Sequence, residues 1–196
     1  MKKNPFSMTM TALFLALVLL LGLTPFGMIP LGFINVTILC VPVIVGTVLL
    51  GLRAGLLLGA CFGVASALSA MGLSLTPPSA LASALVARSP LLALTLCLVP
   101  RLMVPVVAWG VYRLAAHGEE RVYKALPLAA IAGSVTNTVL YLGMMLLFYT
   151  VTGLDNAKLL GIIGGTGLIV GGSEAIVAAL TVTPIVAALW KVKAKR

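Results

Sequence analysis

Arg101 is a lone charge in an apolar run. The segment LVPRLMVPVV, residues 98–107, carries it between two prolines. An unpaired arginine that faces lipid costs about 2.5–3.5 kcal/mol at the centre of a membrane helix. Pro100 and Pro105 each remove a backbone donor, so we expect free carbonyl groups beside the guanidinium. The chemistry that fits such an arginine is the binding of a carboxylate or another anion.

Glu174, in GGSEAIVAAL, is the one other ionisable residue that we place at a similar depth. One interpretation is a structural ion pair between Arg101 and Glu174 that joins two helices. In the other, Arg101 faces a water-accessible cavity and binds an anionic ligand. Both hold if the pair opens for the ligand.

A polar stripe adds hydrogen-bonding groups. Its members are Ser134, Asn137, Thr138 and Tyr141, which follow the i, i+3, i+4, i+7 spacing of one helix face. Contacts between helices could explain the stripe, but we expect Asn137 and Tyr141 to line a pocket near Arg101. Asn35 and Thr37 are further candidates for this pocket, although polar residues there also cap helices.

Catalytic and metal chemistry find little support. The one histidine, His117, lies in a charged segment, away from the buried serines, and the neighbouring Glu119 and Glu120 lack membrane-embedded histidine ligands with which to hold a metal. Cys40, Cys61 and Cys97 lack a second ligand at metal-binding spacing and are interpreted as small buried apolar residues. The glycine-rich run 161–172 lacks the lysine of a phosphate-binding loop. We therefore expect no catalytic residues, metal or cofactor.

The composition indicates a membrane protein. The 196 residues are 61% hydrophobic and 9% charged, with a mean hydropathy of +1.21, far above the apolar share of a soluble domain. Because about 20 apolar residues cross about 30 Å of hydrocarbon, the chain has room for five to seven spans.

Proline, glycine and charged residues separate six apolar segments. We predict a single all-α membrane domain, residues 1–196, whose six transmembrane helices span approximately 8–23, 35–50, 54–72, 89–115, 125–150 and 159–190. The first is interpreted as a retained helix because no small-x-small cleavage site follows it. The last is too long for a vertical span, so its glycine-rich start should be tilted or irregular.

The net charge of +9 is interpreted as a signal of orientation and not of a nucleic-acid partner, because basic residues gather on the cytoplasmic side of membrane proteins. With both termini cytoplasmic, the inside segments hold Lys2, Lys3, Arg53, Arg113, Arg121, Lys124, Lys191, Lys193, Lys195 and Arg196. Only Arg88 and Lys158 fall on external loops. Two longer external connections, 24–33 and 73–88, have the proline and glycine content of lids over an outward pocket.

Five stretches, in this order and spacing, resemble the substrate-binding S component of an energy-coupling factor (ECF) vitamin transporter. They are ALFLA (12–16), GFINVTILCVPVIVGTVLLGLRAGLLLGACFGVAS (32–66), VPRLMV (99–104), AGSVTNTVLYLG (132–143) and SEAIVAAL (173–180). The pantothenate type is most similar, with the hydroxymethylpyrimidine or pyridoxine type next. The segment SLTPPSALASALVARS, residues 74–89, departs from the family pattern, so the resemblance implies no ligand contacts from this loop.

The resemblance implies a vitamin uptake module of the bacterial plasma membrane. Such a module has no ATPase of its own and docks on a transmembrane coupling subunit that is carried by two cytoplasmic ATPases. Ala12 and Ala16 would form the docking face. The pocket would be lined by Asn35, Arg101, Asn137, Tyr141 and Glu174.

The residues also bear on the cargo. Flat heteroaromatic vitamins are usually stacked between aromatic side chains, but aromatic residues make up only 6% of the chain. A flexible aliphatic acid suits Arg101 better. Pantothenate has a carboxylate for that side chain, and hydroxyl and amide groups for Asn137 and Tyr141. Two other classes remain open, a proton-coupled secondary transporter that uses Glu174 and a purely structural membrane subunit.

Overall fold

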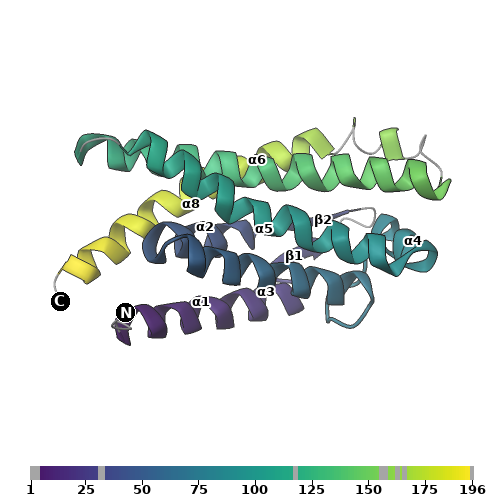
Figure 1. The fold of residues 1–196 in the computed structure, drawn as a ribbon, viewed down its shortest axis with the longest axis horizontal. Coiled ribbons are helices and arrows are strands. Elements are labelled where there is room, and N and C mark those ends of the chain that lie inside the picture. Colours follow the sequence, from purple (N-terminus) through teal and green to yellow (C-terminus); the bar gives the residue numbers. More distant parts are fainter. Residues whose placement is uncertain are drawn as a thin grey trace.

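The computed structural model describes residues 5–30, 34–116, 119–154, 159–161, 164 and 167–194. Its described helices are α1 (Pro5–Leu23), α2 (Cys40–Leu50), α3 (Leu52–Ala70), α4 (Ala80–Arg88), α5 (Pro90–Ala115), α6 (Glu119–Thr152) and α8 (Leu168–Ala194), and its strands are β1 (Met28–Pro30) and β2 (Asn35–Thr37). The long helices run roughly along the longest axis of the molecule (Figure 1). The start of α1 and the end of α8 lie at one end of this bundle, and α4 lies at the other (Figure 1).

The helices have the character of a membrane protein. Four segments of the described chain, Leu52–Ala70, Pro90–Ala115, Tyr123–Thr152 and Ile169–Lys191, are long and apolar enough to cross a bilayer, and Ser7–Leu23 and Cys40–Leu50 are shorter apolar helices. The expectation of a helical membrane protein is therefore confirmed.

The predicted second helix begins later than expected. Residues 35–37 form β2, which pairs antiparallel with β1 in the register Met28 with Thr37 and Pro30 with Asn35, and α2 starts only at Cys40. Val36 and Thr37 are β-branched and suit a strand. The hairpin also satisfies backbone groups where the chain is not helical. The helical prediction for residues 35–39 is wrong for that reason.

The predicted lid 73–88 also contains regular structure. Ser79 caps the N-terminus of α4, because its Oγ accepts a hydrogen bond from the backbone N–H of Ala82 at 3.3 Å. The hydroxyl of Tyr149 on α6 donates to the carbonyl oxygen of Leu81 at 2.8 Å. These contacts fix the lid segment against α6.

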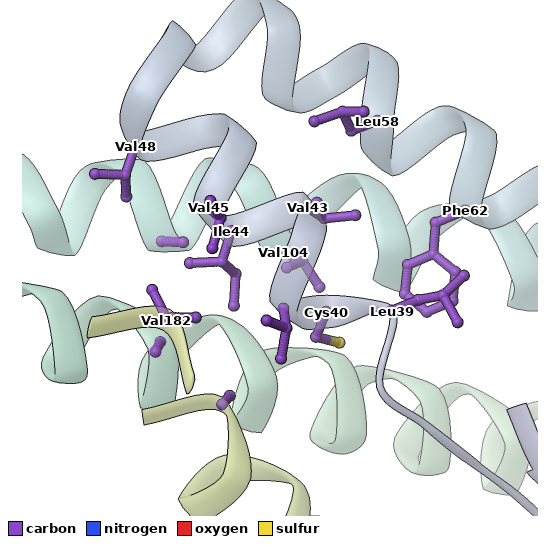
Figure 2. Close-up of a cluster of buried hydrophobic side chains, with 14 of the residues drawn as sticks. Leu39, Cys40, Val43, Ile44, Val45, Val48, Leu58, Phe62, Val104 and Val182 are labelled. Carbon is purple, nitrogen blue, oxygen red and sulfur yellow. The ribbon is translucent and has the colours of Figure 1, made fainter. Parts of the chain in front are cut away.

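The centre of the core is α2, whose residues 40–48 are all buried. A helix that is apolar around its whole circumference must pack on all sides. Figure 2 shows its side chains between Leu58 and Phe62 of α3, Val104 of α5 and Val182 of α8. Through α2 the core sets the positions of the three helices that carry Phe62, Arg101 and Glu174.

Glycines let the outer helices approach closely. A Cβ atom on Gly59 of α3 would lie 2.7 Å from the carbonyl oxygen of Arg101, and one on Gly171 of α8 would lie 2.6 Å from Cγ2 of Thr138. Thus α3 passes directly beside Arg101, and α8 meets α6 one turn before Glu174.

Candidate functional site

Arg101 lies within α5 and is only 4% exposed. Its Nη1 donates a hydrogen bond to the carbonyl oxygen of Leu96 at 3.1 Å. In a regular helix this oxygen would accept from the N–H of residue 100, but residue 100 is a proline and has none. The free carbonyl predicted beside the guanidinium is therefore present, and Arg101 itself bonds to it.

Two aromatic rings hold the guanidinium. Its Cζ lies 5.4 Å from the ring centre of Phe62 on α3 and 4.5 Å from that of Tyr141 on α6. Cation–π contacts at these distances are stabilising, and more so in a desolvated site. Three helices thus fix the orientation of one charge. Tyr141, predicted to offer its hydroxyl, contributes its ring to Arg101.

The guanidinium keeps unused hydrogen-bonding capacity. Arginine has five N–H donors, and Nε of Arg101 is buried without a partner among the described residues. The described part of the chain contains no ion pair between Arg101 and Glu174, so the structural interpretation of these two residues gains no support. The unused donors of Arg101 can bind an external anion.

Two hollows of about 20 and 30 Å³ adjoin Arg101. Both are lined by Asn35, Thr37, Arg101 and Tyr141. The first continues along α3 and the N-terminus of α4, where its further polar lining residues are Ser66, Ser69 and Ser79. The second continues along α6 and α8, where they are Asn137, Thr138 and Glu174. The six residues predicted to bind substrate therefore meet around adjoining hollows.

Glu174 connects α8 to the hairpin. Its Oε1 accepts a hydrogen bond from the backbone N–H of Thr37 at 2.6 Å, and its Oε2 accepts one from Oγ1 of Thr138 at 3.4 Å. The hairpin is also tied to the segment before α4, because Nδ2 of Asn35 donates to the carbonyl oxygen of Pro77 at 3.4 Å. Residues that line the hollows thus also hold the two segments that cover them.

Several polar atoms at the hollows are buried without a protein partner. Among the described residues these include Oδ1 of Asn35, Oγ1 of Thr37, Nε of Arg101 and Oδ1 of Asn137. Leaving one such group unpaired costs about 1–3 kcal/mol. Because four of them gather around the same hollows, we interpret the cluster as a site whose polar groups are satisfied by a ligand.

The wall formed by α3 was not predicted from the sequence. Phe62, Ser66 and Ser69 lie at i, i+4 and i+7 on this helix, and a polar pair on one face of an otherwise apolar helix could have indicated a pocket. Ala12 and Ala16 lie away from the hollows, exposed on α1.

Comparisons with known proteins point to one family. Residues 6–186 match the model of the family described as ECF transporter, substrate-specific component. The chain is also 34% identical over 166 residues to the pantothenic acid transporter PanT of Lactococcus lactis subsp. cremoris (strain MG1363), a match that covers 80% of this chain and 79% of that protein.

Proposed function

This chain belongs to the family of substrate-specific components of ECF transporters, and on that premise we propose that it captures pantothenate in the pocket around Arg101. It is a multi-pass protein of the plasma membrane and a transporter component, not an enzyme. We further propose that it delivers its cargo through a transmembrane coupling subunit and two cytoplasmic ATPases.

The observation that carries the cargo proposal is the buried guanidinium with unused donors beside two hollows. Its planar fork matches a carboxylate, which accepts two parallel N–H donors. Asn137 and Thr37 supply unpaired polar atoms for the hydroxyl and amide groups of pantothenate. Similarity to a protein named as a pantothenic acid transporter supports this choice over hydroxymethylpyrimidine or pyridoxine.

Cargo binding requires the pocket to widen. Pockets that enclose small molecules usually have volumes of about 300–1,000 Å³, well above the two hollows. Arg101 and Tyr141 line both hollows, so movement of α4 and the segment before it away from these side chains would join the hollows. The bonds from Asn35 to Pro77 and from Tyr149 to Leu81 are the contacts that must yield.

We propose six transmembrane helices with both termini cytoplasmic. The start of α1 and the end of α8 share one end of the bundle (Figure 1). Trp109 and Arg113 are in cation–π contact at 5.9 Å near the end of α5, as expected at a cytoplasmic interface. Arg88 ends α4 at the opposite end. In this orientation the hairpin and α4 face the exterior, and Ala12 and Ala16 face the bilayer, where a coupling subunit can dock.

Isothermal titration of the purified protein tests the cargo. The panel comprises pantothenate, its alcohol analogue pantothenol, hydroxymethylpyrimidine and pyridoxine. Pantothenate should bind, and pantothenol should bind at least about tenfold more weakly, since it lacks the carboxylate. Tighter binding of either heteroaromatic compound would assign the pocket to that vitamin. Uptake in cells that lack ECF ATPases would instead favour a proton-coupled carrier.

A further inference from the structure

The second hollow is lined by oxygen atoms that can accept hydrogen bonds, beside hydroxyl and amide groups that can also donate them. Besides Arg101 it is lined by Glu174, Asn137 and Thr37. The carboxylate of Glu174 only accepts hydrogen bonds when ionised. Oδ1 of Asn137 and Oγ1 of Thr37 have no protein partner in the described structure, and these residues are only 4% and 7% exposed. A ligand group that donates a hydrogen bond can therefore bind to Oδ1 of Asn137 or Oγ1 of Thr37.

The Glu174 carboxylate is fixed in place. Its Oε1 accepts a hydrogen bond from the backbone N–H of Thr37 at 2.6 Å. Thr138 contacts the other oxygen, and the close packing at Gly171 holds α8 against α6. These two contacts use about half of the lone-pair positions of a carboxylate. The other lone-pair positions of Glu174 can accept hydrogen bonds from a ligand. Because the two contacts hold the carboxylate in one orientation, it cannot rotate to avoid a negatively charged ligand group.

We propose that Glu174 makes this end of the pocket selective for an uncharged hydroxyl group, so that the protein excludes cargo that is phosphorylated there. The inference rests on the proposed function, which places the cargo carboxylate at Arg101. A hydroxyl group at the far end donates to Glu174 or Asn137. A phosphate ester brings about 1.5–2 negative charges and acceptor oxygens, and among the described residues Arg101 is the single cation that lines this hollow. Selectivity thus has two sources, the hydrogen bond that favours the cargo with a free hydroxyl group and the repulsion that disfavours its phosphate ester.

The substitution Glu174→Gln isolates the charge. Glutamine keeps an oxygen that can accept from the Thr37 N–H and replaces the second oxygen with an amide donor. Titrations compare pantothenate with 4′-phosphopantothenate in wild type, Glu174→Gln and the control Ser173→Ala, whose side chain is exposed on the same helix. Wild type and the control should bind the phosphate ester at least about 100-fold more weakly than pantothenate. In Glu174→Gln, the ratio of the dissociation constant of the phosphate ester to that of pantothenate should be at least about tenfold smaller than in wild type.

The result that overturns the inference is an unchanged ratio in a Glu174→Gln protein that still binds pantothenate, and this result leaves the proposed function intact. Absence of pantothenate binding in wild type overturns both. Should Glu174→Gln not fold, wild type is titrated with the 4′-methyl ether of pantothenate, which is enlarged but uncharged. At least about tenfold tighter binding of the ether than of the phosphate ester supports exclusion by charge. Equal binding of the ether and the phosphate ester overturns the inference, because the size of the added group alone then explains the exclusion of both.

Discussion

Arg101 donates from Nη1 to the carbonyl oxygen of Leu96 at 3.1 Å, five residues earlier on the same helix. Pro100 leaves that oxygen without its helical donor. One interruption in α5 thus supplies both a free acceptor and the means to orient the charge, while Nε of the side chain has no partner among the described residues.

The substitution Pro100→Ala tests how the proline positions the arginine. The new N–H can bond to the carbonyl oxygen of Leu96 in place of Arg101, so we expect pantothenate affinity to fall about 3- to 30-fold. The melting temperature should stay level or rise, because proline within a helix costs about 3 kcal/mol. The control is Pro184→Ala in α8, which should leave affinity unchanged. Full affinity in Pro100→Ala would show that Leu96 does not orient the guanidinium.

Removal of the guanidinium tests the anion site. Arg101→Ala should weaken pantothenate binding at least about tenfold, since a hydrogen bond to a charged group contributes about 1.5–3 kcal/mol. Arg101→Lys should recover part of the loss, because an ammonium group keeps the charge without the planar fork. Pantothenol serves as the control ligand and should be affected much less. An affinity for pantothenate within about threefold of wild type would rule out Arg101 as the carboxylate partner.

Two substitutions of Tyr141 distinguish the contribution of its ring from that of its hydroxyl group. The ring lies 4.5 Å from Cζ of Arg101, so Tyr141→Phe should keep pantothenate affinity within about threefold. Tyr141→Ala should weaken pantothenate binding about tenfold or more, because a desolvated cation–π contact contributes about 2 kcal/mol. Calorimetry on both variants measures the difference. If the phenylalanine variant is as weak as the alanine variant, the hydroxyl group carries the interaction.

Gly59 tests the close contact between α3 and α5. A Cβ atom there would lie 2.7 Å from the carbonyl oxygen of Arg101, so Gly59→Ala should destabilise the protein by about 1–3 kcal/mol through overpacking. The control Gly110→Ala adds a Cβ with nothing within 4 Å and should be neutral or stabilising. Thermal unfolding in detergent compares the two. Equal melting temperatures would show that the helices can separate at this point without cost.

Ala12 and Ala16 test the docking face. Both are exposed on α1, where a tryptophan would keep another helix at a distance. Ala16→Trp should abolish co-purification with the coupling subunit and vitamin uptake, while pantothenate binding by the isolated protein is preserved. The matched control is Val139→Trp, at a position 62% exposed on α6. Normal uptake by Ala16→Trp would place the docking surface elsewhere.

Much of this protein could be predicted from local sequence. Hydropathy identified the apolar segments, since an apolar run long enough to cross hydrocarbon has few alternatives to a helix. The prolines beside Arg101 predicted the free carbonyl group, because a missing N–H is a property of the residue itself. Spacing on α6 placed Asn137, Thr138 and Tyr141 on one face, which the second hollow confirms.

Tertiary structure decided what these side chains contact. The sequence allowed Arg101 to pair with Glu174, but the fold directs the guanidinium to Leu96, Phe62 and Tyr141 and the carboxylate to Thr37 and Thr138. The hairpin at residues 28–37 escaped prediction because its three-residue strands are too short for a periodic pattern. Its Thr37 N–H donates to Glu174, which lies 137 positions further along the chain. Local sequence sets which groups are left without a partner, whereas only the packing of distant helices determines which group is close enough to satisfy them.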